Sequence, residues 1–559
     1  MDTYTLGIDF GTKSVRAILL NSLNGNLKAI SDVAYPHGVI TSKLPNSAVP
    51  LEKGWALQHP QDYVDCLVEA VTECLEEAEV DRSEVVGMGI DFTASTILPI
   101  DSSGMPLCLR TEWAENKHSW VKLWKHHAAY QEKEEINQVA HQTNQSFLSN
   151  YGGEISEEWM LPKVLQILKE APEVYEAADA FIEAGDWVVF QLTGNLIRST
   201  CMAGYKGLWD YEEGFPDPAF LEQVHPDLKH FFRDKMAGTI QAPGDRAGTL
   251  HKALAERLGL SEYVVVSTAI IDAHASVIGS GIKDEQAMLS VMGTSLCQMI
   301  LSDVKKPAPG IGGVVKDGIL PGRFAYETGQ ASGGDVFEWF IDNMVPESLM
   351  AEAESEGISI YQLLTREAGQ LSPGESGLVA LDWWNGNRST LKKPELSGTI
   401  VGLTVDTKPE EIFRALMEAL AFGTRKIVEV LAESGISITT FYNSGGLAEK
   451  NEVLMQIYAD VIGRPMNVIK TPHTSARGAA ILGAVAAGPE NGGWEGFTSG
   501  LDSLGTVDYK VFEPREANHR IYEELYAFYD DLYESFGKGA DMMGRLRSLQ
   551  QTHTGERIT

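Results

Sequence analysis

The feature that most constrains the fold is a pattern that occurs twice: two apolar runs separated by a short turn that contains Gly-Thr. The first copy covers residues 6–20, with Gly11 and Thr12 in its turn, and the second covers residues 287–301, with Gly293 and Thr294. Apolar runs on both sides of a short polar turn predict a β-hairpin. We therefore expect two hairpins of one design at distant points of the chain.

Other elements repeat around these hairpins. A helix predicted over residues 61–79 precedes an apolar strand at 85–90, and a helix predicted over 410–434 precedes a strand at 439–446. The repeated order predicts two related halves that meet near Ile282, with chance similarity of the hairpins as the alternative. The length of 559 residues is consistent with two large domains, because single cores rarely grow that large.

The two turns have the chemistry of phosphate binding. Glycine lets the backbone approach a ligand closely, and successive N–H groups in a turn can hold a phosphate. In the first turn Thr12 adds a hydroxyl, Lys13 adds a positive charge, and Asp9 at the strand end offers an oxygen ligand for Mg²⁺. An ordinary hairpin with a polar tip explains one turn equally well. Two facing turns, however, could grip a nucleoside triphosphate and exclude water as the halves close.

A third glycine-rich segment lies near the end of the second half. Gly445 and Gly446 end a predicted strand, and Asn451 begins a helix predicted over residues 451–462. Backbone without side chains at this point could lie flat against an adenine or a ribose. Residues 475–484 predict a helix of small residues, for which close packing is the better interpretation.

Composition limits the partners and the location of the protein. The formal net charge of −33 would repel nucleic acid and acidic membranes, so we expect neither as a partner. The five cysteines are odd in number and lack zinc-site spacing, which is typical of reduced thiols in the cytoplasm. The sequence shows no signal-peptide pattern and no apolar run of membrane-spanning length, so we expect a cytoplasmic protein.

Four further segments carry local predictions. Residues 113–140 predict a long helix, on which the adjacent His126 and His127 would point to different sides and share no metal. Residues 200–209 predict a loop, and residues 263–271 a strand that ends at Asp272. The polar tail beyond Phe536 is expected to fray.

Taken together, the motifs resemble the FGGY family of carbohydrate kinases. Residues 9–16 and 292–295 are similar to the family's two phosphate turns, 444–451 to its adenosine motif, and 157–163 and 398–403 to its two signature segments. The resemblance implies an α/β fold of duplicated actin-like ATPase (ribonuclease H-like) domains with a cleft between them. It also implies an N-terminal domain over 1–282 for sugar binding, a C-terminal domain over 283–540 for nucleotide binding, and a polar tail over 541–559.

A narrower set of segments is similar to family members that phosphorylate L-ribulose. These segments are residues 55–60, 89–94, 121–128, 203–206, 271–275 and 381–388. The sequence departs from the pattern at Asn387, where many relatives carry Glu, and at Leu416, which fits the second signature poorly. Neither departure touches the expected chemistry.

The resemblance implies a reaction and a set of site residues. The γ-phosphoryl group of ATP, with Mg²⁺, would be transferred to the terminal hydroxyl of L-ribulose, or of related 2-ketopentoses, in arabinose catabolism. Asp272 matches the catalytic aspartate that accepts the hydroxyl proton; a helix-capping role ahead of Ala273 is the structural alternative. The sugar would be held by Ala94, through its main chain, and by Lys206, Asp272 and Glu327; for Lys206 and Glu327 a surface ion pair is the alternative.

The implied nucleotide contacts follow the glycine-rich segments. Gly11, Thr12, Lys13, Gly293 and Thr294 would hold the phosphates, Gly445, Gly446 and Asn451 would line the nucleoside, and Asp9 would bind Mg²⁺ directly or through water.

Three other functions stay open at this point. The first is an FGGY kinase for another sugar or polyol, such as xylulose. The second is an actin-like ATPase without sugar kinase activity, and the third is a catalytically inactive sugar sensor, against which the intact Asp9, Asp272 and glycine turns argue. Relatives in the family also suggest a homodimer.

Overall fold

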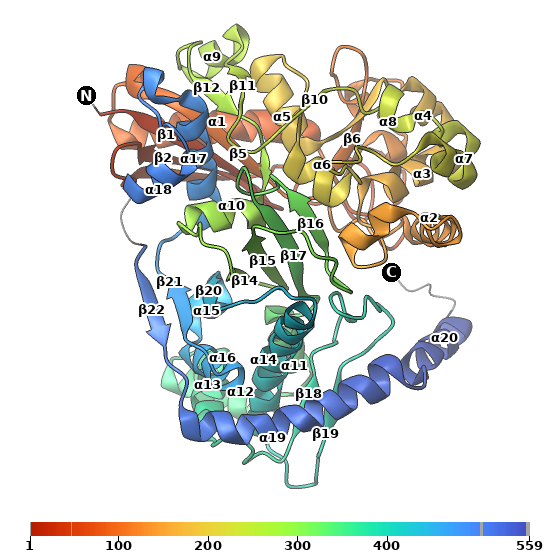
Figure 1. Ribbon diagram of the computed structural model, residues 1–559, viewed down its shortest axis with the longest axis vertical. Coiled ribbons are helices and arrows are strands. Elements are labelled where there is room, and N and C mark those ends of the chain that lie inside the picture. Colours follow the sequence, from red (N-terminus) through yellow and green to blue (C-terminus); the bar gives the residue numbers. More distant parts are fainter. Residues whose placement is uncertain (1, 46, 504–506, 555–559) are drawn as a thin grey trace.

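The computed structural model describes residues 2–45, 47–503 and 507–554, and it contains two seven-stranded mixed sheets with helices around them (Figure 1). The first sheet has the order β11-β12-β5-β1-β2-β3, with β13 beside β5. Its strands are β1 Tyr4–Phe10, β2 Ser14–Asn21, β3 Leu27–Ala34, β5 Val85–Phe92, β11 Arg246–Thr249, β12 Val265–Ser267 and β13 Ile270–Ile271.

The second sheet has the order β16-β17-β15-β14-β20-β21-β22. Its strands are β14 Ala287–Met292, β15 Leu296–Ser302, β16 Gly313–Lys316, β17 Phe324–Gln330, β20 Thr440–Ser444, β21 Met466–Ile469 and β22 Tyr509–Phe512. A smaller sheet, β4-β7-β6-β8, joins Leu57–Gln58, Val121–Lys122, Ile97–Ile100 and Ala180–Glu183.

Equivalent strands of the two large sheets pair in the same way. Strand β1 is antiparallel to β2 and parallel to β5, and β14 is antiparallel to β15 and parallel to β20. Helix α1 (Pro60–Ala78) precedes β5, just as helix α14 (Pro409–Glu433) precedes β20. Both predicted hairpins and the repeated order of elements are therefore confirmed.

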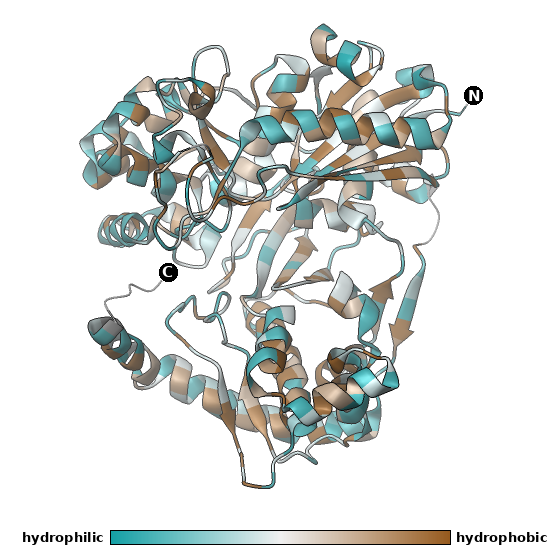
Figure 2. Ribbon diagram, turned by 180° about the vertical axis from the view of Figure 1, so that it is seen from behind, coloured by the Kyte–Doolittle hydropathy of each residue, from teal (hydrophilic) through white to brown (hydrophobic). Residues whose placement is uncertain are grey.

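Two large apolar cores pack against the sheets. Buried side chains of β1, β2, β5 and α1 form one cluster, which also includes Leu289 of β14 and Met299 of β15; the other faces of β14 and β15 pack with α14 and helix α16 (Glu452–Ile462) in a second cluster. Figure 2 shows brown, apolar strands inside the molecule and outer helices that alternate between apolar and hydrophilic stretches. A third sizeable cluster surrounds residues 159–168, so the chain has several cores, as its length predicts. Among the described residues, no helix combines the length and apolarity that crossing a bilayer requires.

Helix α17 (Thr474–Ala487) comes late in the chain but packs on the first sheet, beside β1 and β2 in Figure 1. It lies so close that a Cβ added to Gly7 or Gly89 would stand 1.9 Å or 1.7 Å from a carbonyl oxygen of α17. This confirms that the small residues of 475–484 serve close packing. Because α17 lies far beyond residue 282 in the chain but packs on the first sheet, the division of the chain at that residue stays a prediction.

Two local predictions are wrong. The segment 113–140 holds a short turn and strand β7, and helix α2 begins only at Tyr130 (Tyr130–Gln142). Buried Trp120 and Leu123 have helical spacing, but they are buried by neighbouring strands and loops instead of one helix face. Residues Thr200–Lys206 form helix α6, which Ser199 caps, where a loop was expected.

The remaining two segments differ in part from their predictions. The single strand expected over residues 263–271 is divided into β12 and β13. The tail forms helix α20 (Met542–Thr554), which is anchored by buried Met543, so the expected fraying is wrong for this part. Residues 555–559 of the predicted tail lie outside the described residues.

Candidate functional site

The first glycine turn joins β1 to β2 and is fixed by contacts from outside the hairpin. The Gly11 N–H donates to the Ser14 carbonyl at 3.0 Å. The Thr12 carbonyl accepts from Gln58 Nε2 at 2.9 Å, and its hydroxyl accepts from Trp124 Nε1 at 3.1 Å. Sequence reasoning missed both supporting side chains, although they lie in segments 55–60 and 121–128 that carry the family resemblance. Because Thr12 accepts at both oxygens, its hydroxyl proton is free to point toward a phosphate.

Lys13 follows in the same turn. Its carbonyl accepts from the Tyr35 N–H at 2.9 Å, while its side chain is exposed. The backbone of this turn is thus held in place, and the lysine can move to meet a charged ligand.

The second turn joins β14 to β15 and borders an open pocket. The Gly293 N–H donates to the Ser295 carbonyl at 3.0 Å, and both Gly293 and Thr294 are exposed. The pocket has a volume of about 840 Å³, and its lining includes Gly293, Gly446, Tyr361 and Arg366. The structure therefore brings the second turn and the third glycine-rich segment together around one space.

Gly445 and Asn451 shape this pocket without lining it. Gly445 has φ +93°, and a Cβ there would stand 2.7 Å from the Met292 carbonyl oxygen, so the close approach of two strand ends requires glycine. Asn451 is completely buried: its side chain accepts from the Leu454 N–H at 2.9 Å, which caps α16, and donates to the Tyr361 hydroxyl at 2.7 Å. Asn451 therefore positions Tyr361, which borders the pocket. The sequence had instead suggested that Asn451 itself contacts the nucleoside.

Three carboxylates lie at the ends of three neighbouring strands. Asp9 of β1 stands in register with Asp91 of β5, whose other neighbour is Ile270 of β13. Asp272 follows β13 as the first residue of helix α10 (Asp272–Gly279), and its Oδ1 accepts from the Ala273 N–H at 2.7 Å. Parallel strands end at one edge of a sheet, where α/β folds bind ligands.

Burial and mutual repulsion raise the pKa values of all three carboxyl groups. Burial raises the pKa of Asp272 to about 7, and the charge of Asp9 adds to the effect. Burial also raises the pKa of Asp91 well above its usual value, with contributions from Asp9 and Asp272. The pKa of Asp9 is likewise raised by burial, although Arg16, at 3.3 Å, opposes the rise. Asp272 can therefore exchange a proton near neutral pH.

Asp91 is a site residue that the sequence analysis missed. It is fully buried beside Asp9, and its protonated carboxyl group shares a hydrogen bond with the Asp9 carboxylate. The available signal was a repeated tetrapeptide, Gly-Ile-Asp-Phe, at residues 7–10 and 89–92. It places Asp9 and Asp91 at equivalent points of paired strands.

Lys206 and Glu327 form a buried ion pair between the two halves. Lys206 ends helix α6 and Glu327 lies in β17, with Nζ 2.7 Å from Oε1 and 3.0 Å from Oε2. Their residues are 4% and 7% exposed, which rules out the surface pair considered above. Burial alone would raise the pKa of Glu327, but Lys206, His274 and Arg388 together hold it at about 2. The charges of both members of the pair also act on Asp272.

Ala94 lies in the loop that follows β5 and is half-buried. The next residue, Ser95, has φ +51°, an uncommon conformation for a residue with a side chain. Buried Lys163 of helix α3 (Met160–Glu170) holds this loop, because its Nζ donates to the Ser95 carbonyl at 2.6 Å and to the Leu123 carbonyl at 2.8 Å. Lys163 thereby connects the Ala94 loop to the segment that carries Trp124.

Comparison with known proteins gives near full-length matches. Residues 4–279 match the N-terminal domain and residues 288–487 the C-terminal domain of the FGGY family of carbohydrate kinases. The chain is 48% identical to a protein named ribulokinase from Anoxybacillus flavithermus, over 98% of this chain and 97% of that protein. It is 39% identical to a ribulokinase from Staphylococcus aureus (strain Newman), over 98% of this chain and 99% of that protein.

Solved structures share the fold at low identity. The xylulose kinase from Rhodospirillum rubrum superposes with a TM-score of 0.78 at 22% identity, covering 95% of this chain and 98% of that chain. A gluconate kinase from Lactobacillus acidophilus gives a TM-score of 0.79 at 18% identity, covering 96% of this chain and 98% of that chain. These likenesses confirm the expected fold of duplicated actin-like α/β domains, and at such identities they show the fold alone.

Proposed function

Because the chain belongs to the FGGY family of carbohydrate kinases, we propose that it transfers the γ-phosphoryl group of ATP to the terminal hydroxyl of L-ribulose. The product would be L-ribulose 5-phosphate, which would enter arabinose catabolism. One observation carries the proposal: Asp272 begins α10 beside the strand ends that hold Asp9 and Asp91, and His274 of the same helix lies 3.4 Å from Glu327 of the buried Lys206–Glu327 pair. A base at that position can accept the proton of a sugar hydroxyl while the hydroxyl attacks a phosphoryl group held nearby.

Asp272 is the proposed general base. A sugar hydroxyl is a weak nucleophile, and its attack is assisted when a neighbouring group accepts the proton. With a pKa of about 7, Asp272 is ionised in a large share of molecules at neutral pH and still binds a proton firmly once it has accepted one. The Ala273 N–H fixes the orientation of the carboxylate.

Phosphoryl transfer otherwise depends on positioning and on neutralising charge. Gly11, Thr12 and Lys13 from one half and Gly293 and Thr294 from the other are the proposed phosphate contacts. The nucleoside would bind in the pocket beside Gly446. Gly445 allows the strand ends to approach closely, and Asn451 would act indirectly by positioning Tyr361.

The residues present fit a magnesium ion. The carboxyl oxygens of buried Asp91 and of Asp9, side by side on paired strands, are the hard oxygen donors that Mg²⁺ prefers. When bound, Mg²⁺ would neutralise charge on the phosphate oxygens, with Asp9 as the proposed ligand, directly or through water.

The sugar is proposed to bind at Lys206, Glu327, Asp272 and the main chain of Ala94. The ion pair holds a donor and an acceptor at fixed positions before any ligand arrives. Sugar recognition needs such fixed polar groups, because each hydroxyl must exchange its water contacts for equivalent ones.

Measuring ATP consumption with a panel of acceptors tests this proposal. We expect the highest kcat/KM with L-ribulose, and lower values with D-ribulose, D-xylulose and glycerol. Preference for D-xylulose or a polyol would indicate that the chain is an FGGY kinase for that substrate instead. Equal ATP hydrolysis with and without sugar would favour the actin-like ATPase, and sugar binding without turnover would favour a sensor.

The setting of the enzyme is part of the same proposal. We place it in the cytoplasm, as a homodimer, with ATP and a small sugar as its partners and no nucleic acid or membrane partner. Light scattering during size-exclusion chromatography would measure the number of subunits.

A further inference from the structure

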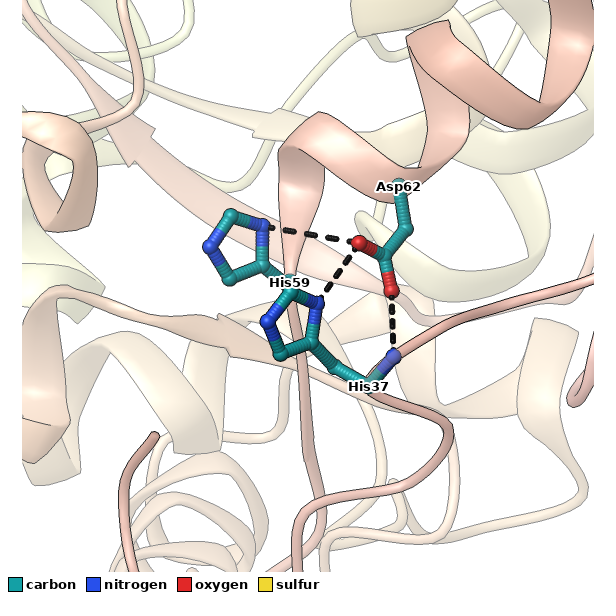
Figure 3. A group of neighbouring side chains, drawn as sticks. All are labelled: His37, His59 and Asp62. Atoms are coloured by element: carbon teal, nitrogen blue, oxygen red, sulfur yellow. Dashed lines mark hydrogen bonds and ion pairs between the residues drawn. The ribbon is translucent and has the colours of Figure 1, made fainter. Parts of the chain in front are cut away.

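Two histidines and an aspartate meet at the start of helix α1, apart from the site described above (Figure 3). His37 Nδ1 lies 2.8 Å from Asp62 Oδ1, and His59 Nδ1 lies 3.8 Å from the same oxygen. Figure 3 shows both Nδ1 atoms on the side of the rings that faces Asp62. Three donor atoms therefore converge on one small space.

Local structure brings the three residues together. His59 is the N-cap of α1, and Asp62 lies in its first turn, three residues further on. His37 comes from the segment that follows β3, and its N–H donates to Asp62 Oδ2 at 3.0 Å. The two imidazole rings are stacked in nearly parallel planes, with centroids 4.2 Å apart, and His59 Nδ1 accepts from the Gln61 N–H at 3.3 Å. Because a ring nitrogen binds a metal in the plane of its ring, the exposed ring of His37 must turn before both Nδ1 atoms bind one ion.

We propose that His37 Nδ1, His59 Nδ1 and the Asp62 carboxylate bind a divalent transition-metal ion, for which Zn²⁺ is the best match. Imidazole nitrogen and carboxylate oxygen are common zinc ligands, whereas Mg²⁺ prefers oxygen ligands. Zinc ligands lie about 2.0–2.1 Å from the metal, so two of them in a tetrahedron are roughly 3.3 Å apart. The separation of 2.8 Å is now a hydrogen bond between His37 and Asp62, and the separation of 3.8 Å joins His59 to Asp62, so the side chains must move by about 0.5 Å to receive the ion.

Exposure of the cluster suits a site with three protein ligands. His37 is exposed, His59 is half-buried and Asp62 is buried, so the ion would be anchored on the protein side and open to water on the other. Sites with three protein ligands take water or another small molecule in the fourth position.

The site would also touch the support of the first glycine turn. Tyr35, two residues before His37, donates to the Lys13 carbonyl, and Gln58, next to His59, donates to the Thr12 carbonyl. An ion between His37 and His59 would tie these two supports together. We expect bound Zn²⁺ to change the KM for ATP, a consequence that rests on the proposed function, whereas metal binding itself does not.

Calorimetric titration of the untagged, full-length protein with Zn²⁺ tests the site. The protein is first stripped with a chelator and then kept in excess Mg²⁺, which occupies the carboxylates of the other site. We expect one equivalent of Zn²⁺ to bind, and affinity to fall at least about tenfold in His37→Gln and in His59→Asn. Asn is chosen at position 59 because it is a good helix N-cap, so α1 keeps its start.

The chain offers a matched control in His225, whose Nδ1 lies 3.9 Å from Asp227 and which belongs to no group of three such ligands within the described part of the chain. His225→Gln should bind Zn²⁺ like the unchanged protein. The absorption spectrum of bound Co²⁺ is a second readout, and it should lose its signal in both cluster variants. The proposal is overturned if the unchanged protein binds no equivalent, or if either cluster variant binds as tightly as the control; His37 and Asp62 would then form only a hydrogen-bonded clasp.

Discussion

The sharpest prediction concerns the pH dependence of kcat/KM for L-ribulose. The pKa of Asp272 is raised to about 7 by burial and by Asp9, and only the ionised carboxylate can accept the hydroxyl proton. The ionised fraction is then about 90% at pH 8 and about 10% at pH 6, which predicts a roughly tenfold fall in kcat/KM between them. The ligand-free protein is the relevant state, because kcat/KM reports the pKa values of the free enzyme. The assay is ATP consumption at each pH, with ATP and L-ribulose both well below their KM values, so that the free enzyme predominates.

A matched control separates Asp272 from other groups that titrate in the same range. Burial also raises the pKa of Asp186 to about 7, but this carboxylate accepts from the Ser199 N–H and lies outside the proposed site. Asp186→Asn should keep the fall in kcat/KM below pH 7, whereas Asp272→Asn should bind ATP and lose turnover at every pH. A flat profile between pH 6 and 8, a fall only near pH 4, or substantial turnover by Asp272→Asn would refute the reasoning.

Three further variants test other parts of the structure. Lys206→Met should raise the KM for L-ribulose at least about tenfold and that for ATP far less, since it removes a sugar contact and the cation that is hydrogen-bonded to buried Glu327; equal changes in both KM values would contradict this. Trp124→Phe should raise the KM for ATP about fivefold, because the Thr12 hydroxyl loses one hydrogen bond; an unchanged KM would show that this contact is dispensable. Gly89→Ala should lower the melting temperature or prevent folding, because its Cβ would stand 1.7 Å from a carbonyl of α17, and calorimetry would measure it; unchanged melting would contradict that packing.

The elements that the sequence predicted well are those with strong local patterns. Both hairpins have unbroken apolar runs around a glycine turn, and α14 has a long apolar face, so local periodicity determines the result. The prediction for residues 113–140 was wrong because Trp120 and Leu123 have helical spacing, whereas residues 121–122 pair with strands β4 and β6 in a sheet. Such pairing with distant strands leaves no trace in local periodicity.

The candidate site divides in the same way. Asp272 and the Lys206–Glu327 pair were found through the family resemblance, because no local pattern joins residues so far apart in the chain. Asp91 was missed because a single aspartate at a strand end looks ordinary until pairing sets it against Asp9. The indirect role of Asn451 could not be predicted either, since it depends on the placement of Tyr361 from a separate helix.

The late position of α17 has a consequence for synthesis of the protein on the ribosome. Strands β1 and β5 emerge early, but their glycine faces stay uncovered until residues 474–487 have been translated. The first sheet therefore stays incompletely covered, with apolar surface accessible to chaperones, until most of the chain has been synthesised. A product truncated before codon 474 would keep every residue of the first sheet and still lack the helix that closes it.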